Sequence, residues 1–213
     1  MKEKFALRAH CRQDVCAPRC ALRIMRVFCA IEIPDAVRQQ VLRYIGRVRE
    51  AVPDARASWS RDANLHLTLK FLGEISQASV PHLSEAASRA TAGMQPFSIR
   101  LEQTGVFPSA RQPRVLWLGI KDSSAKLAEL HARLEEECAS AGFLKEVRPF
   151  HPHLTIARLR QPAAARALAA AHLQMKFEPV EIAVAELLVI RSELNSAGSK
   201  YTIVTRNELG ADH

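Results

Sequence analysis

Two halves of this chain of 213 residues carry the same polar motif inside an apolar run, as HLTL beginning at His66 and HLTI beginning at His153. Each run is rich in Leu, Ile, Phe and Thr and is bounded by turn-forming residues, which is typical of β-strands. The stretch before each motif has nearly the same length, because His66 follows Val27 by 39 positions and His153 follows Val115 by 38. The repeat predicts two equivalent lobes, each with one histidine strand.

The hydrophobic pattern of both halves predicts strands that alternate with helices. In chain order we expect strands over 26–33, 65–73, from 97, 114–121, 153–159, near 177–190 and over 201–205, with helices from Asp35, Ser79, Ser124 and Ala163 between them. A segment rich in Pro, Gly and Arg, 105–113, separates the halves. We therefore expect one domain over 25–206, with halves at about 25–105 and 114–206, and a tail over 207–213.

Side chains alternate between the two faces of a strand, so residues two apart share a face. His66, Thr68 and Lys70 are therefore expected together on one face of the first histidine strand. His153 and Thr155 are expected together on one face of the second.

Arg158 is a further candidate, because a guanidinium binds phosphate oxygens in a forked arrangement. It stands three positions after Thr155, so strict alternation would turn it to the opposite face. Its participation requires a β-bulge, the strand end or the reach of its long side chain. The alternative is a solvated surface arginine beside Arg160.

A lone His-x-Thr on a strand is usually no more than the polar face of a sheet. A second copy at the same place in the repeat favours a functional role instead, because two facing lobes would bring two imidazoles to one cleft. Imidazole titrates near pH 6.5, so one neutral ring can take a proton from water while the other, protonated, gives one to a leaving oxygen. Phosphodiester hydrolysis needs both steps, and threonine hydroxyls with Lys70 or Arg158 would hold the non-bridging oxygens.

Metal hydrolysis is a competing interpretation, since His151 and His153 share a strand face and could be two ligands. Most hydrolytic metal sites also use carboxylates, and no Asp or Glu lies between Val147 and Leu173. Pro152 between the two rings, as a stiff turn into the strand, explains the pattern without a metal. We expect no metal and no other cofactor.

Charge and cysteine content constrain the substrate class and the cellular compartment of the protein. The net charge is +8, but residues 1–24 hold six basic and two acidic side chains, which leaves +4 for the rest. That surplus is compatible with a polyanionic substrate and equally with simple solubility. No apolar run approaches the roughly 20 residues of a membrane-spanning helix. Five cysteines at irregular spacing form no disulfide framework, which indicates a soluble, cytoplasmic protein. Nothing requires more than a monomer.

Residues 1–24 are expected to be a disordered leader. They carry Cys11, Cys16 and Cys20 before any strand or helix pattern begins. A metal knuckle with His10 is the alternative, although the spacings match no common zinc pattern. Met25 directly precedes the first strand-like run, so translation could also begin there.

Longer strings around the motifs resemble a known family, the 2H phosphoesterases, and within it the RNA 2′,3′-cyclic phosphodiesterases, formerly called 2′-5′ RNA ligases. The likeness covers residues 25–206 through the segments RVFCAIEIP, NLHLTLKFLGE, PRVLWLGI and PFHPHLTIAR, and through the late pattern of Ser192, Gly198 and Tyr201. Residues 1–24 have no counterpart in this pattern.

The resemblance implies an α+β fold of two pseudo-symmetric lobes, each an antiparallel sheet with outer helices, around a central active-site cleft. It implies the following site: His66 and His153 as the catalytic pair, with Thr68, Thr155 and Arg158 on phosphate. The implied reaction opens a 2′,3′-cyclic phosphate, on RNA ends such as those of tRNA or on small cyclic nucleotides, to a 2′-phosphate without metal. Which histidine is acid and which is base stays open. The alternatives are 2′-5′ RNA ligation as a reverse or side activity, and a nucleotide- or RNA-binding module without turnover.

Overall fold

The computed structural model describes residues 24–160, 162–195 and 198–210. The strands are β1 (Ile24–Glu32), β2 (Ala57–Trp59), β3 (His66–Ser76), β4 (Phe97–Phe107), β5 (Val115–Lys121), β6 (His153–Leu159), β7 (Val180–Val184), β8 (Glu186–Asn195) and β9 (Gly198–Glu208). The helices are α1 (Asp35–Ala51), α2 (Val80–Thr91), α3 (Lys126–Ser140) and α4 (Pro162–Gln174), with short 3-10 helices η1 (Asp62–Asn64) and η2 (Gln77–Ser79). Both histidine strands are therefore present where the sequence predicts them.

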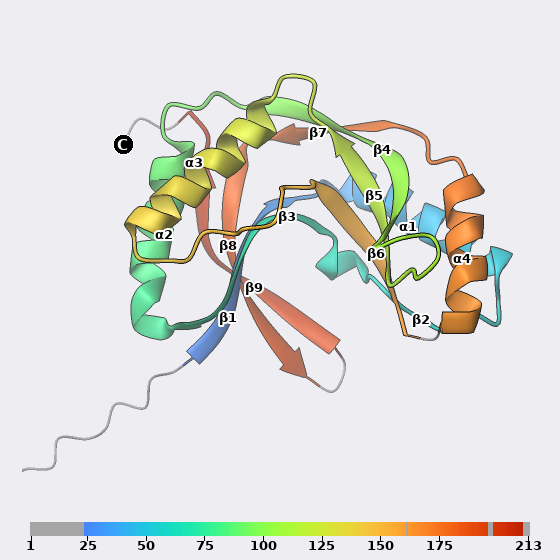
Figure 1. Ribbon diagram of the computed structural model, residues 1–213. Helices are drawn as coiled ribbons and strands as arrows, with labels where there is room; N and C mark the ends of the chain where they lie inside the picture. The colour runs from blue at the N-terminus through green and yellow to red at the C-terminus, as the bar shows by residue number, and fades with distance from the viewer. Residues whose placement is uncertain (1–23, 161, 196–197, 211–213) are drawn as a thin grey trace, which may run out of the picture.

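Two antiparallel sheets form the core, with helices on their outer faces (Figure 1). The first sheet has the strand order β3-β1-β8-β9 and the second has the order β2-β6-β5-β4-β7. Helices α2 and α3 pack together and contact strands of the first sheet, whereas α1 and α4 pack together and α4 contacts β4 of the second. This confirms the expected α+β fold with two sheets and outer helices.

Local sequence accounts for the central elements. In β1, five consecutive residues from Val27 to Ile31 are buried, as expected for a strand covered on both faces. The apolar stripe of α1 is buried as its helical spacing predicts, through Val37, Val41, Tyr44, Ile45 and Val48. In the described part of the chain, no helix has both the length and the apolar character needed to cross a bilayer.

Each sheet combines strands from both halves of the sequence. Strands β1 and β3 pair in one sheet with β8 and β9, and β4 joins β5 and β6 in the other. The prediction that each contiguous half, 25–105 or 114–206, builds its own lobe is therefore wrong. The hydrophobic pattern shows that β1 is buried, but it does not specify its second neighbour, because strand pairing is set by tertiary packing. We infer that the two lobes form one domain, since neither sheet can form from one half alone.

The C-terminal segment takes part in the fold. Asn207 and Leu209 are buried, and the Asn207 Nδ2 group donates a 2.9 Å hydrogen bond to the carbonyl of Leu187. The prediction of a tail that starts at residue 207 is therefore wrong for 207–210. Four residues are too few to give a periodic signal, and they are ordered by pairing with β8 and by the hydrogen bond from the Leu209 N–H to the carbonyl of Ala185.

The leader is the remaining prediction about the chain ends. Strand β1 begins at Ile24, one residue inside the expected leader. Residues 1–23, with His10 and the three cysteines of that segment, lie outside the described residues, and so does the leader prediction.

Candidate active site

The first histidine begins β3 and lies in an apolar setting. The His66 ring is 4.7 Å from the Phe28 ring and 5.1 Å from the Tyr201 ring, measured between centroids. Phe28 belongs to a small buried cluster on this sheet, against which Tyr201 packs. Burial lowers the pKa of His66 to about 4, against the opposing effect of a hydrogen bond to the backbone of Asn64. His66 is therefore neutral at pH 7 in the free protein.

The second histidine begins β6 and has a matching arrangement. The Nδ1–H group of His153 donates a 2.6 Å hydrogen bond to the carbonyl of His151. Because a carbonyl only accepts, this bond places the proton of the neutral ring on Nδ1 and leaves Nε2 to exchange protons. Burial lowers the pKa of His153, and the positive charge of Arg158 adds to that effect. Each histidine thus bonds to the backbone two residues before it.

A β-bulge follows the threonine in both histidine strands. In β6, Thr155 pairs with Trp117 while Ala157 pairs with Leu116, so Ile156 is the extra residue. Ile156 and Ala157 are both buried, and alternation resumes with Arg158 exposed. The bulge therefore turns Arg158 toward the face of His153, which is the condition for Arg158 to take part in the site.

The same bulge in β3 removes Lys70 from the site. Thr68 pairs with Ala30 while Lys70 pairs with Cys29, so Leu69 is the extra residue. Lys70 turns into the core, where its side chain is 1% exposed and its Nζ lies 2.7 Å from a Glu135 carboxylate oxygen. The prediction that Lys70 shares the face of His66 and Thr68 is wrong, because strict alternation does not hold across a bulge.

Phe71 takes the place in the first lobe that Arg158 has in the second. Both residues follow their histidine by five positions, and the Phe71 side chain is 63% exposed next to Phe28. Phe71 is not among the site residues that the sequence pattern predicted. Aligning the strings HLTLKF and HLTIAR by their histidines would have shown the equivalence.

The two threonines are partly exposed beside their histidines. Among the residues that the structure describes, neither the Thr68 hydroxyl nor the Thr155 hydroxyl has a hydrogen-bond partner. Their strand neighbours Leu67 and Leu154 are fully buried on the opposite face. Both hydroxyls are therefore free to bind a ligand on the helix-free faces of the two sheets.

The segment between β2 and β3 ties the two motifs together. The Ser60 hydroxyl donates to the carbonyl of Thr155 at 2.8 Å, and the Ser60 N–H donates to the carbonyl of Ile156 at 2.9 Å. His66 follows Ser60 by six residues, which span at most roughly 20 Å when fully extended. Strands β3 and β6 also contact each other directly and lie next to each other in Figure 1. The two His-x-Thr motifs are thus held at the junction of the two sheets.

Aromatic side chains line the second motif. The Phe107 ring lies 5.0 Å from the His153 ring and the Trp117 ring lies 6.2 Å from it. A Cβ atom on Gly105 would come within 2.0 Å of the Trp117 ring, so the indole lies flat on this glycine. Its Nε1–H is buried without a hydrogen-bond partner among the described residues. Trp59, the third aromatic near the motifs, is partly buried in β2 opposite Ala157.

The metal interpretation has little support in the residues present. In the described ranges, no three His, Cys, Asp or Glu side chains are placed to hold a metal ion. His151 uses its carbonyl to hold His153 and its ring lies beside Phe107. The rings that contact His66 and His153 are aromatic, and the one carboxylate paired across the strands with His66, Glu32, lies in ion pairs with Arg38 and Arg206.

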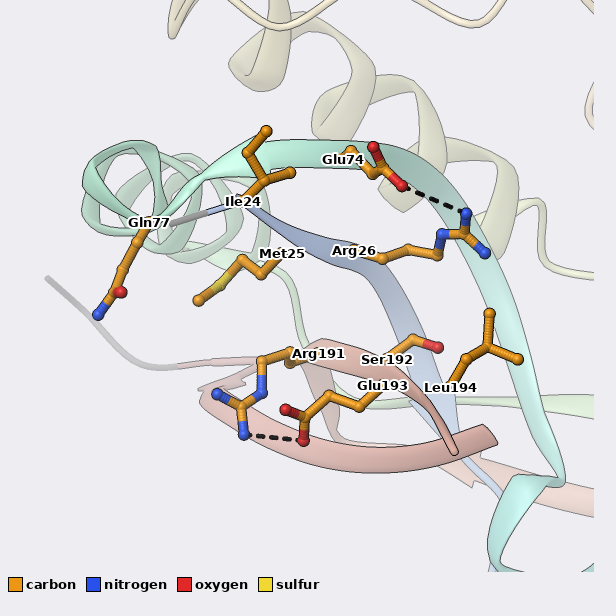
Figure 2. A pocket seen from close by; sticks show the side chains of 9 residues that line it. All are labelled: Ile24, Met25, Arg26, Glu74, Gln77, Arg191, Ser192, Glu193 and Leu194. Atoms are coloured by element: carbon orange, nitrogen blue, oxygen red, sulfur yellow. Dashed lines mark hydrogen bonds and ion pairs between the residues drawn. The ribbon is translucent and has the colours of Figure 1, made fainter. Parts of the chain in front are cut away.

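A hollow of about 400 Å³ lies beyond the first motif and is bordered by β1, β3 and β8 (Figure 2). It contains two arginines, but each faces a glutamate. Arg26 lies 3.5 Å from Glu74, and Arg191 lies 3.0 Å from Glu193. These pairings neutralise its cations, so we do not place the phosphate site there.

The fold and the site define the class. Two equivalent bulged strands from two sheets each present a histidine and a threonine, with one guanidinium beside them, which is the arrangement of a two-histidine phosphoesterase. The family model of the 2′-5′ RNA ligase superfamily matches residues 33–195, and the chain belongs to this superfamily.

Named relatives agree with this assignment. The RNA 2′,3′-cyclic phosphodiesterase of Methanothermobacter thermautotrophicus is 33% identical over 181 residues, which cover 84% of this chain and 95% of that protein. Its counterpart from Escherichia coli K12 is 37% identical over 134 residues, which cover 62% and 71%. Among solved structures, TT0787 of Thermus thermophilus has a TM-score of 0.71 at 28% identity, and the match covers 89% of this chain and 100% of that chain. E. coli LigT complexed with 3′-AMP has a TM-score of 0.70 at 27% identity, with coverage of 89% and 100%.

Proposed function

We propose that this chain hydrolyses RNA or nucleoside 2′,3′-cyclic phosphates to 2′-phosphomonoesters, by paired histidine acid and base catalysis and without a metal ion. The observation that carries the proposal is the pair of equivalent bulged strands, each presenting His-x-Thr on a helix-free face at the junction of the sheets. The printed names of the relatives support the substrate class.

The proposed reaction needs one proton acceptor and one proton donor. Water attacks phosphorus and gives its proton to a neutral imidazole, while the bond from phosphorus to O3′ breaks and O3′ takes a proton from the other imidazole. Burial lowers the pKa of His66 to about 4, so His66 is the ring suited to accept the proton. His153 then serves as the acid. Thr68, Thr155 and Arg158 hold the non-bridging oxygens, where charge develops.

In the proposed reaction, the cation that balances the phosphate charge lies on the His153 side of the site. Arg158 stands beside His153, whereas the equivalent position beside His66 holds Phe71. The rings of Phe28 and Tyr201 pack on His66, and their contribution is burial that keeps the base neutral.

The direct test is hydrolysis of a nucleoside 2′,3′-cyclic phosphate in excess EDTA, with the product identified by phosphorus NMR. We expect turnover to the 2′-phosphate at an unchanged rate when EDTA is present. Binding without turnover would instead indicate a nucleotide- or RNA-binding module. Incubation with two RNA halves measures 2′-5′ joining as a side activity.

The pH dependence of kcat/KM is expected to be bell-shaped with its maximum below pH 6.5. On the acid side the rate falls as His66 is protonated near its lowered pKa of about 4. On the alkaline side it falls as His153, whose pKa is also lowered, loses its proton. A bound phosphate anion raises both pKa values, so the profile of kcat should lie at higher pH than that of kcat/KM. A kcat/KM profile without slope between about pH 4 and pH 9 would exclude shared acid and base work.

Thr68→Val and Thr155→Val are each expected to lower kcat/KM by roughly 10- to 100-fold, because each removes one donor to the developing charge. The melting temperature should change little, since neither hydroxyl has a partner among the described residues. Thr202→Val, at an exposed position of β9, is the matched control and should leave activity unchanged. If both site variants kept full activity, the hydroxyls would have no part in binding phosphate.

We also propose that the protein acts as a cytoplasmic monomer. One chain contains both histidine motifs, so catalysis needs no second copy. Cys29 and Cys138, the cysteines within the described residues, are both buried and free, as suits a reducing compartment. Light scattering during gel filtration, at assay concentration, tests the monomer.

A further inference from the structure

The segment that leads into His153 needs external support. Residues 143–152 form no helix or strand, and they connect α3 to β6. Leu144 and Val147 are 91% and 93% exposed, so the segment does not anchor itself by burying these apolar side chains. Phe143 and Phe150 pack against the core near its two ends, so the position of residues 144–149 between them depends on contacts that other elements make to the backbone.

A buried ion pair supplies the first of these contacts. The Lys70 Nζ group donates to a Glu135 carboxylate oxygen at 2.7 Å and to the carbonyl of Leu144 at 2.9 Å. The same Glu135 oxygen accepts the N–H of Glu146 at 3.0 Å. A side chain of β3 and one of α3 thus hold two backbone groups of the segment.

Further contacts hold the part of the segment that lies next to the catalytic ring of His153. His131 of α3 stacks on Phe150, with 3.9 Å between ring centroids and 9° between ring planes. The carbonyl of Pro152 accepts the N–H of Ile120 at 3.2 Å. Between these two points lies His151, whose carbonyl accepts the proton of His153 Nδ1.

We propose that Lys70 and Glu135 are positioning residues for His153, because they hold the segment so that the His151 carbonyl fixes the orientation and tautomer of the catalytic ring. Lys70 follows the first motif directly in β3, so the strand that carries the first histidine also holds the segment that leads to the second. The inference rests on the proposed function for its kinetic consequence. Its structural consequence, the state of the His153 ring, is measurable without activity.

Lys70→Met is expected to lower kcat by about 10- to 100-fold with little change in KM, since misplacement of a catalytic group by a fraction of an ångström acts mainly on the reacting geometry. The imidazole nitrogen NMR signals of His153 should shift, while those of His66 stay in place as an internal reference. The melting temperature should fall by about 10 °C, because Glu135 is left as an unpaired buried charge.

The double variant Lys70→Met with Glu135→Leu separates positioning from stability. Removing both charges should restore most of the melting temperature, because a buried pair replaced by apolar side chains is often neutral for folding. In the double variant both the carbonyl of Leu144 and the N–H of Glu146 lose their partners, so kcat should remain low and the His153 signals should remain shifted. This variant also answers the question if the single variant fails to fold.

Lys126→Met is the matched control on α3. The Lys126–Glu129 pair has the same 2.7 Å separation, but its side chains are about half exposed, so no effect on kcat or on His153 is expected. The inference is overturned if the folded double variant shows wild-type kcat and unshifted His153 signals, because the pair would then serve stability alone. Absence of hydrolysis by the wild type would refute the proposed function and leave the NMR result to decide the positioning role.

Discussion

His66→Ala and His153→Ala are each expected to lower kcat by about 10²- to 10⁴-fold, because each ring carries one proton transfer of the proposed reaction. The fold should survive both changes. His66 and His153 are partly exposed on the helix-free faces, and the main hydrophobic core does not include them. Single-turnover assays at the pH optimum, with circular dichroism of each variant, measure the loss and the fold.

His82→Ala is the control for these variants, since His82 is exposed on α2 and contacts neither motif. It should have wild-type rates. Near-normal turnover by His66→Ala or His153→Ala would contradict the assignment of that ring. The double variant should be little slower than the slower single variant, because two groups that act in one step do not contribute additively.

Gly105→Ala is expected to have the largest effect on stability among the substitutions that add atoms, at about 1–3 kcal/mol of unfolding free energy. The added Cβ would lie 2.0 Å from the Trp117 ring, so the indole must leave its place. Trp117 packs on Phe107 and near His153, and the Gly105 carbonyl accepts from the buried His172 ring at 3.1 Å. We therefore expect a loss of activity together with the loss of stability. Denaturant unfolding measures the stability, and tryptophan fluorescence reports the displacement of the indole.

Gly46→Ala is the paired control. Gly46 lies within α1 with no atom near the position of a Cβ, so alanine should raise stability by about 0.5–1 kcal/mol. Activity should not change. If Gly105→Ala were as stable as the wild type, the flat packing of Trp117 on the strand would not be a requirement of the fold.

Much of the secondary structure was predictable because it depends on local patterns. The burial of Val37, Val41 and Val48 in α1 follows from helical spacing, and the two histidine strands follow from alternation and composition. The pairing of β1 with β8 was not predictable from such patterns. Any apolar strand of the second half could have filled that place, because pairing depends on packing between distant segments.

The site was predictable in part for a similar reason. Residues two apart share a face, so the association of each histidine with its threonine was evident. The orientation of the residues after each threonine depends on the bulges. These turn Lys70 into the core and place Arg158 and Phe71 on the exposed face of their strands. A bulge is a mismatch in register between two paired strands, so neither strand contains it alone.

The sequence by itself therefore determined the repeated plan, the two His-x-Thr motifs and their equivalence, because these rest on spacing within one strand. Only the tertiary structure decided which cation stands beside the site and which is buried with Glu135. It also decided the apolar surroundings that lower the pKa of His66, since Phe28 and Tyr201 reach that ring from two other strands. The physical reason is that register and burial arise between segments that are far apart in the chain.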